Sequence, residues 1–319
     1  MITISVPAKV HLLGEHSVVY GKPALLSAIN LRVLVTISSE IKQRKNATED
    51  PYDENAFALQ KIIETVIKKK FKIKTIPPYR IKVTSEIPIG YGLGSSAAIS
   101  AGYSAALLSF LKIEWDYTLV NEIAYEGEKL FHGNPSGGDV AAVINGGFIW
   151  FRKELESLKI IHPIPHKIHK SIGQFFLIDS GKPVENTKEM VRLVKQKLAA
   201  ESSKLKAIFD DQEKLTKELL VSLLDGNQAD LINTIKKGEK NLETLGVVGS
   251  KVKSMIRDVE SIGGACKILG GGGVTDGSGM LLAYHQNSKE LLELIKHNKW
   301  NFKRIKLGET GLKKEFLKV

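Results

Sequence analysis

Three glycines alternate with other residues in one short stretch of this chain, and two serines follow them directly. The glycines are Gly90, Gly92 and Gly94, and the serines are Ser95 and Ser96. Glycines let backbone N–H groups approach a phosphate closely, and the N-terminus of a following helix favours negative charge. A serine hydroxyl at the end of such a loop is a hard oxygen ligand of the kind that Mg²⁺ binds. The spacing therefore predicts a phosphate site, and the alternative is a glycine-rich turn before a buried helix.

Two common phosphate-binding patterns do not match this stretch. No lysine follows the glycines, so the loop is not of the GxxxxGK[ST] type. The GxGxG spacing also differs from the GxGxxG of dinucleotide-binding folds, and no acidic residue ends a strand about 20 residues further on. The loop therefore belongs to another class of phosphate site.

The segments on either side of the loop have the patterns needed to position it. Residues 81–84 alternate apolar and polar side chains, which predicts a strand. Residues 97–111 are small and apolar and contain no proline, which predicts a helix. The order strand, loop and helix N-terminus is the arrangement that an anion site requires.

A second stretch with chemical potential lies near the N-terminus. It contains Lys9, Glu15 and His16 within eight residues, among apolar residues and glycines. One interpretation is a strand and turn with surface charges, in which the Glu-His pair is only hydrogen-bonded. A lysine between apolar neighbours is unusual for a surface position, so Lys9 is a candidate functional residue.

In chain order, these segments resemble the motifs of the GHMP small-molecule kinases. That superfamily shows Pro-x-Lys and Gly-Glu-His, then Pro-x-Gly-x-Gly-Leu-Gly-Ser-Ser-Ala-Ala, then Pro-Ser-Gly-x-Asp. The matching segments here are residues 7–9, 14–16, 88–98 and 135–139.

Within the superfamily, two segments are similar to the mevalonate kinase branch. They are residues 14–21 (GEHSVVYG) and residues 132–139 (HGNPSGGD). The second half of the chain matches less closely, because residues 267–274 (KILGGGGV) lack the Thr and Ala of the third family motif. We therefore assign no residue roles to the glycines of this third segment.

The resemblance implies a fold and an activity. The expected fold class is α+β, with an N-terminal domain at residues 1–165 and a C-terminal domain at residues 166–319. The expected reaction is ATP-dependent, Mg²⁺-assisted phosphorylation of (R)-mevalonate to 5-phosphomevalonate. The alternative is another kinase of the superfamily, acting on phosphomevalonate, homoserine or a sugar.

The resemblance also implies roles for individual residues. Asp139 matches the general base and Lys9 its electrostatic partner, while Ser96 and Glu128 match the magnesium ligands. The expected nucleotide contacts are Ser85, Gly90, Gly92, Leu93, Gly94, Ser95, Ser96 and Ala97. The expected substrate positions are Glu15, His16, Ser136 and Thr187. The mevalonate carboxylate needs a cation or N–H donors, which His16 and nearby glycine N–H groups could supply.

Three of these residues also have structural interpretations. Asp139 follows two glycines and Thr187 precedes a predicted helix, so each has the position of a helix N-cap. Glu128, on a predicted helix, would otherwise be an ordinary charge on the solvent face.

The composition limits the remaining classes of protein. The net charge is +11, from 46 basic and 35 acidic residues, but the lysine clusters at 68–74 and 313–314 lack interleaved aromatic residues. This favours a solvated surface over a nucleic-acid groove, although a basic nucleic-acid-binding protein remains the alternative of another class.

Cysteine content and hydropathy bear on compartment and partners. The single cysteine, Cys266, excludes an internal disulfide, and no stretch of 18 apolar residues exists. The N-terminus lacks the features of a signal peptide. We therefore expect a cytoplasmic protein with no membrane partner, and a homodimer stays open.

Beyond the motifs, patterning predicts further elements. Strands are expected at 2–6, 31–37, 147–151, 174–179 and 280–284, and helices at 56–70, 117–131, 188–224 (two), 230–242, 247–261 and 288–297. Residues 42–54 are expected to form a loop, and residues 155–170 to mark the domain boundary.

Overall fold

The computed structural model describes residues 1–39, 54–132 and 135–315. Most of the predicted loop at 42–54 therefore lies outside the described residues. The strands are β1 (Ile2–Leu13), β2 (Ala24–Ser39), β3 (Tyr79–Ser85), β4 (Phe148–Lys153), β5 (Lys159–Ile164), β6 (Phe175–Asp179), β7 (Ala265–Ile268), β8 (Met280–Tyr284), β9 (Phe302–Ile305) and β10 (Lys313–Glu315). The helices are α1 (Glu54–Phe71), α2 (Ser95–Phe110), α3 (Tyr117–His132), α4 (Gly138–Asn145), α5 (Thr187–Ala200), α6 (Ser202–Asp225), α7 (Gln228–Leu245), α8 (Ser250–Ser261) and α9 (Ser288–His297), with a 3-10 turn η1 (Ser17–Tyr20).

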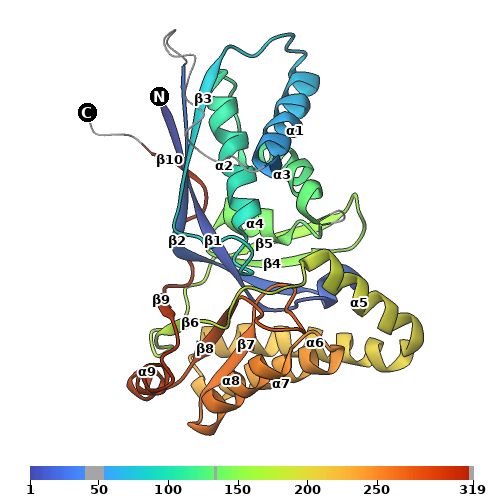
Figure 1. Cartoon of the computed structure of the whole chain (residues 1–319), viewed down its shortest axis with the longest axis vertical. Helices are drawn as coiled ribbons and strands as arrows, with labels where there is room; N and C mark the ends of the chain where they lie inside the picture. The colour runs from blue at the N-terminus through green and yellow to red at the C-terminus, as the bar shows by residue number, and fades with distance from the viewer. Residues whose placement is uncertain (40–53, 133–134, 316–319) are drawn as a thin grey trace.

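The first sheet is antiparallel and is built around two long strands. Its order is β10-β1-β2-β4-β5, and β3 pairs with the C-terminal half of β2. The N-terminal part of β2 pairs instead with β4, so β2 joins two parts of the sheet. Helices α1, α2 and α3 lie together beside this sheet (Figure 1). β10 brings the C-terminal part of the chain back to β1.

The second sheet is antiparallel, with the order β7-β8-β6-β9. Helices α7 and α8 contact β7, and Figure 1 shows them in the half of the molecule away from α1. A hydrophobic cluster that includes Ile178, Val252 and Ile256 lies between this sheet and its helices. Burial of these apolar side chains holds the helices on the sheet.

The largest hydrophobic cluster includes residues from both halves of the chain. It contains Val10 of β1, Ala101 of α2, Leu177 of β6 and Leu215 of α6. Helices α6 and α7 also contact β1 directly. Strand β1 therefore packs against α2 as well as against α6 and α7. These contacts fix the position of Lys9, which lies on β1. The division at residue 165 stays a prediction.

Most of the predicted elements are confirmed. The helix expected at 117–131 is α3, and the two helices expected within 188–224 are α5 and α6. The expectation for residues 155–170 missed β5, and neither β9 nor β10 was predicted, because these short strands have little periodicity of their own. The mixed helix-and-sheet class is as expected. Within the described residues, no helix is long and apolar enough to cross a membrane.

Candidate active site

The glycine loop connects β3 to α2 and adopts a conformation that glycine favours. Gly90, Gly92 and Gly94 have φ values of 84°, 80° and 73°, in the left-handed region. A Cβ on Gly92 would lie 2.7 Å from the carbonyl oxygen of Leu269, and one on Gly94 would lie 2.9 Å from the Lys9 side chain. The loop is thus packed between β1 and the segment after β7. α2 starts at Ser95 with no acidic residue in its first turn, so its positive end stays available for an anion.

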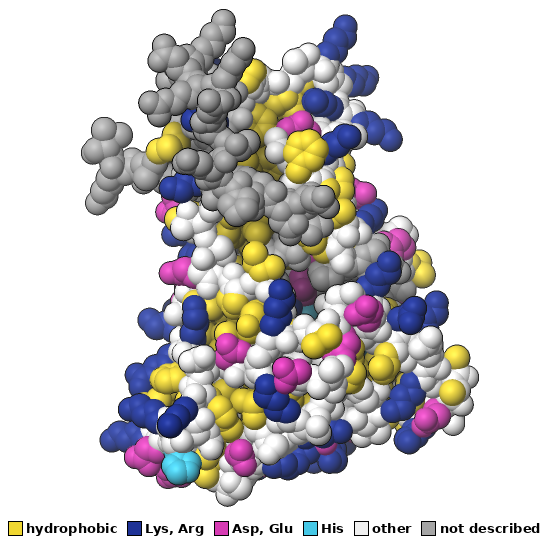
Figure 2. All heavy atoms as spheres, viewed as in Figure 1, with side chains coloured by type: hydrophobic (Ala, Val, Ile, Leu, Met, Phe, Trp, Pro, Cys, Tyr) yellow, Lys and Arg dark blue, Asp and Glu magenta, His cyan; other side chains and the backbone are white. Residues whose placement is uncertain are grey.

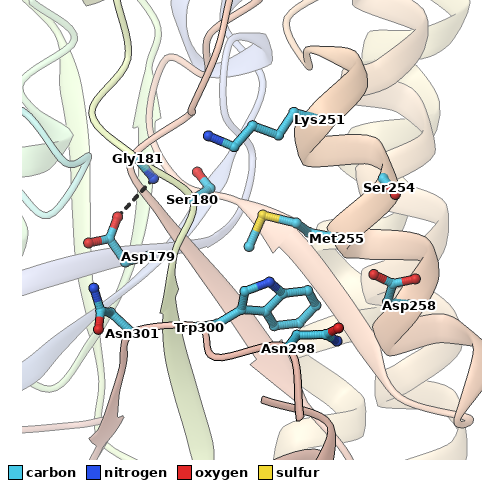
Figure 3. A pocket seen from close by; sticks show the side chains of 10 residues that line it. All are labelled: Asp179, Ser180, Gly181, Lys251, Ser254, Met255, Asp258, Asn298, Trp300 and Asn301. Carbon is cyan, nitrogen blue, oxygen red and sulfur yellow. Dashed lines mark hydrogen bonds between the residues drawn. The ribbon is translucent and has the colours of Figure 1, made fainter. Parts of the chain in front are cut away.

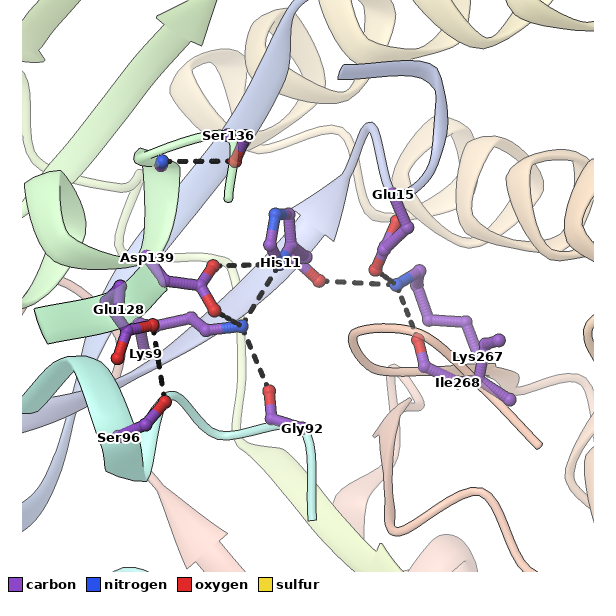
Figure 4. A network of polar contacts seen from close by, with 11 residues as sticks. Lys9, His11, Glu15, Gly92, Ser96, Glu128, Ser136, Asp139, Lys267 and Ile268 are labelled. Atoms are coloured by element: carbon purple, nitrogen blue, oxygen red, sulfur yellow. Dashed lines mark hydrogen bonds and ion pairs between the residues drawn. The ribbon is translucent and has the colours of Figure 1, made fainter. Parts of the chain in front are cut away.

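Lys9 joins the glycine loop to Asp139. Its side chain is 1% exposed, and its Nζ lies 3.0 Å from the Gly92 carbonyl oxygen and 3.2 Å from Asp139 Oδ2 (Figure 4). Nζ also lies 3.2 Å from Nδ1 of His11, which the sequence analysis did not single out. Since residues two apart in a strand share a face, the position of His11 relative to Lys9 was a usable signal.

Asp139 lies in the first turn of α4 but does not cap it. The N-cap is Gly137, so the interpretation of Asp139 as a helix cap is wrong. Its side chain is 29% exposed, so a substrate hydroxyl can reach it. Ser136 lies beside it, and the Ser136 Oγ accepts a hydrogen bond from the Gly138 N–H at 3.2 Å.

Glu128 and Ser96 meet at the start of α2. Glu128 is 1% exposed, so the solvent-face interpretation is wrong. The Ser96 Oγ donates a hydrogen bond to Glu128 Oε2 at 3.3 Å (Figure 4). A hydroxyl and a carboxylate are both hard oxygen donors, so the pair has the chemistry that suits Mg²⁺.

A buried ion pair joins Glu15 to the second sheet. Lys267 of β7 is 0% exposed, and its Nζ donates hydrogen bonds to Glu15 Oε1, to the His11 carbonyl at 3.2 Å and to the Ile268 carbonyl at 2.7 Å (Figure 4). These contacts use all three ammonium protons. Glu15 therefore faces Lys267. Lys267 is the first residue of the third family motif, and its spacing in the sequence did not indicate this contact.

Glu239 of α7 lies next to this ion pair and is fully buried. Its Oε2 accepts a hydrogen bond from the Ile268 N–H at 3.0 Å. Burial raises the pKa of Glu239 to about 8, so the side chain is protonated at neutral pH. Helical spacing places Glu239 on the same face as Ile235 and Leu242, which was the available sequence signal.

His16 and Thr187 both lie against the third glycine segment. His16 has a φ of 57°, and its Nε2 lies 3.0 Å from the Gly271 carbonyl oxygen. A Cβ on Gly271 would lie 3.4 Å from Thr187 Oγ1, and one on Gly270 would lie 3.2 Å from the Gly92 Cα. The third segment therefore bridges the phosphate loop and the predicted substrate positions.

The first residue of α5 is Thr187, but it is not the cap of that helix. Asn186 is the N-cap, and it forms a reciprocal capping box with Glu189. The interpretation of Thr187 as the N-cap is therefore wrong, and its hydroxyl is not used for capping.

The two histidines of the site are neutral near pH 7. Burial, followed by the charge of Lys9, lowers the pKa of His11 to about 3. Burial lowers the pKa of His16 to about 4. His16 therefore brings no positive charge of its own near pH 7, and its role as a substrate contact stays a prediction.

The remaining predicted nucleotide residues are distributed along the loop. The Lys9 N–H donates to the carbonyl oxygen of Leu93 at 3.1 Å, and Ala97 is buried in the core. Ser85 ends β3, where its hydroxyl exchanges hydrogen bonds with the backbone of Ile87. Ser85 is thus placed at the entry of the loop, apart from the Lys9 network.

A separate pocket lies between α8 and the segment before β9. Figure 3 shows Trp300 and Asn301 on one side and Lys251 on the other. Lys251 is paired with Asp276 at 2.7 Å. Neither Lys9 nor Asp139 lines this pocket, so it is distinct from the candidate site.

Comparison with known proteins gives the family. The model of the GHMP kinases N terminal domain matches residues 58–147. The mevalonate kinase of Pyrococcus abyssi is 30% identical over 86% of this chain and 87% of its own. The mevalonate kinase of Archaeoglobus fulgidus is 31% identical over 84% of this chain and 88% of its own. The chain belongs to the mevalonate kinase family.

Solved structures confirm the mevalonate kinase fold. The Methanococcus jannaschii mevalonate kinase superposes with a TM-score of 0.78 at 22% identity, over 96% of this chain and 98% of its own. The L. major mevalonate kinase in complex with R-mevalonate gives a TM-score of 0.78 at 19% identity, over 96% of each chain.

Proposed function

We propose that this mevalonate kinase family member transfers the γ-phosphoryl group of ATP to the primary hydroxyl of (R)-mevalonate. The products are ADP and 5-phosphomevalonate. The observation that carries the proposal is the contact between Lys9 and Asp139 at the edge of the glycine loop. It places a carboxylate and a buried ammonium beside the predicted phosphate site. We propose mevalonate as the substrate because the chain belongs to the mevalonate kinase family.

The chemistry follows from these two side chains. Asp139 accepts the proton of the substrate hydroxyl as its oxygen forms a bond to the γ-phosphorus. The bond between that phosphorus and the bridging oxygen breaks, and ADP leaves with the electron pair. Lys9 contacts Asp139 at 3.2 Å and offsets negative charge near the transferring group.

The start of α2 is proposed to bind the phosphates. The N–H groups around Gly94 and Ser95 lie at the positive end of the helix. Ser96 and Glu128 would hold Mg²⁺, and their hydroxyl and carboxylate oxygens fit that ion. When bound, Mg²⁺ neutralises charge on the phosphates. Ser85 remains a predicted nucleotide contact.

The substrate side is proposed to be formed by Ser136, His16 and Thr187, whose side chains come from three different parts of the chain. In this arrangement Glu15 acts through Lys267, because that ion pair holds the turn that carries His16. A cytoplasmic location and a homodimer stay predictions, and the buried thiol of Cys266 is compatible with a reducing compartment.

The alternatives differ in what they require. Another kinase of the superfamily would use the same Lys9 and Asp139 on a different alcohol. A nucleic-acid-binding protein would need a continuous basic surface. On the face shown in Figure 2, basic and acidic side chains are interspersed, which does not favour that function.

A coupled ADP-release assay tests the proposal. Mg-ATP is supplied with mevalonate, 5-phosphomevalonate, homoserine or galactose as the acceptor. We expect turnover on mevalonate. Turnover on another acceptor alone would keep the chemistry and change the substrate, and no turnover on any acceptor would refute the kinase function.

Asp139→Asn tests the base in the same assay. We expect kcat to fall by about 10²- to 10⁴-fold, the usual contribution of general base catalysis, with an unchanged Kd for ATP. Asp225→Asn, the same change at an exposed helix end, is the control and should keep full activity. An Asp139→Asn enzyme with the wild-type rate would exclude this residue as the base.

A further inference from the structure

The two fully buried lysines of the candidate site, Lys9 and Lys267, already have protein partners. Lys9 contacts Asp139 itself, and Lys267 donates hydrogen bonds to Glu15 and to two backbone carbonyls. His11 and His16 are neutral, as shown above. Mevalonate carries a carboxylate, and burying a carboxylate without a cation or N–H donors is costly. Together with N–H donors, a further cation near Asp139 would therefore stabilise that charge.

Lys159 lies beside the turn that leads to Asp139. It is the first residue of β5, at the end of the connection from β4. A Cβ on Gly137 would lie 3.3 Å from the Lys159 Cδ and 3.4 Å from its Nζ. Gly137 directly follows Ser136 and is the N-cap of α4. The ammonium is therefore placed beside the turn that carries Ser136, one of the predicted substrate residues.

The Lys159 ammonium has no carboxylate partner among the described residues. Its Nζ lies 3.2 Å from the centroid of the Tyr125 ring, which is a cation–π contact. The acidic residue of the same connection, Glu156, is paired with Lys153 at 2.7 Å and accepts a hydrogen bond from the Tyr125 hydroxyl at 2.5 Å. Lys159 is thus a half-buried cation held in place by an aromatic ring.

The surroundings of Lys159 set its charge. Glu126 and Lys129 face it from α3, Lys153 from β4 and Glu156 from the connection. Burial lowers the pKa of Lys159 to about 8, against the opposing effect of Glu156. The side chain is therefore mainly a cation at neutral pH and loses its charge at mildly alkaline pH.

We propose that Lys159 binds the carboxylate of the acceptor substrate and thereby selects an alcohol that carries a carboxylate. The inference rests on the proposed function and adds the residue that recognises the acid end of the substrate. The cation–π contact with the Tyr125 ring restrains the Lys159 ammonium, which lowers the entropy lost when the carboxylate binds.

The test compares two substrates that have the same reacting hydroxyl. Mevalonate carries the carboxylate, and mevalonamide replaces it with a neutral amide. We expect wild-type enzyme to prefer mevalonate in kcat/KM, and Lys159→Met to reduce that preference by about 10- to 100-fold, the range for a hydrogen bond to a charged group. The rate with mevalonamide and the KM for ATP should change little. Lys159→Arg should keep most of the preference.

Lys129→Met is the matched control. Lys129 lies over the same ring at 5.2 Å but is paired with Glu126 at 2.6 Å, so its loss should leave the substrate preference unchanged. Unfolding temperatures of all variants check that they fold. A folded Lys159→Met enzyme that keeps the full preference would overturn the inference and leave the proposed function intact.

A second measurement uses the wild-type enzyme alone. The KM for mevalonate should rise as the pH passes about 8, while the KM for mevalonamide should not, and Lys159→Arg should abolish the difference. Parallel pH profiles for the two substrates would overturn the inference. If wild-type enzyme phosphorylates another acceptor but neither of these, the proposed substrate fails and the inference fails with it.

Discussion

Replacing Lys267 with methionine should be among the most destabilising single changes in this protein. The Lys267 side chain is 0% exposed and that of its partner Glu15 is 1% exposed. Lys267→Met preserves most of the side-chain volume but leaves Glu15 as a buried charge. The other carboxylate oxygen of Glu15 already lacks a hydrogen-bond partner in the described structure, so nothing there compensates.

The expected loss follows from the number of contacts removed. Three hydrogen bonds disappear, and the carbonyls of His11 and Ile268 lose a donor. Removing one partner of a buried ion pair typically costs about 3–5 kcal/mol. Folded proteins typically have a total free energy of unfolding of about 5–15 kcal/mol, so the variant should retain a much smaller free energy of unfolding.

Urea denaturation followed by circular dichroism at pH 7 measures this effect. The set comprises wild type, Lys267→Met, Glu15→Gln and the double variant. Because the double variant contains no unpaired buried charge, its loss of unfolding free energy should be clearly smaller than the sum of the two single losses.

Lys251→Met is the control for the same chemical change on the surface. Lys251 and Asp276 form an exposed pair at 2.7 Å, with side chains 54% and 55% exposed, so its loss should cost no more than about 1 kcal/mol. The reasoning fails if Lys267→Met costs less than about 1 kcal/mol, or if the double variant loses the full sum.

Two further predictions concern the proposed magnesium ligand Ser96 and the buried acid Glu239. Ser96→Ala should raise the Mg²⁺ concentration needed for half-maximal turnover, because it removes one proposed oxygen ligand. A titration with Mg²⁺ at saturating ATP measures this, and an unchanged requirement would exclude Ser96 from the metal site. Burial raises the pKa of Glu239 from 4.5 to about 8, so between these values the folded protein holds a proton that the unfolded chain releases. The contribution of Glu239 to the free energy of unfolding should therefore fall as the pH rises from about 4.5 to about 8, and Glu239→Gln should remove this part of the pH dependence in urea denaturation at several pH values. Equal slopes for both proteins would contradict the assignment.

Local patterns in the sequence were sufficient to predict the loop and the helix of the proposed phosphate site. Alternating glycines at Gly90, Gly92 and Gly94 predict a loop with left-handed backbone, and a small apolar stretch predicts the helix after it. Both are properties of neighbouring residues, and both are confirmed. The family motifs also predicted Asp139 as the general base and Lys9 as its electrostatic partner.

The sequence alone could not show which distant side chains meet. Lys9 and Asp139 are far apart in the chain, as are Glu15 and Lys267, yet each pair is in contact. Such contacts depend on how the sheets and helices pack, which no local spacing encodes.

The charge states of the site were also decided by the tertiary structure. His16 has a side chain that can carry a positive charge, but burial keeps it neutral, whereas Lys159 belongs to no motif and lies beside the turn that carries Ser136. Motifs therefore predicted which residues take part in the chemistry. Only the packing, through desolvation and proximity, decided which of them hold a charge and what each one faces.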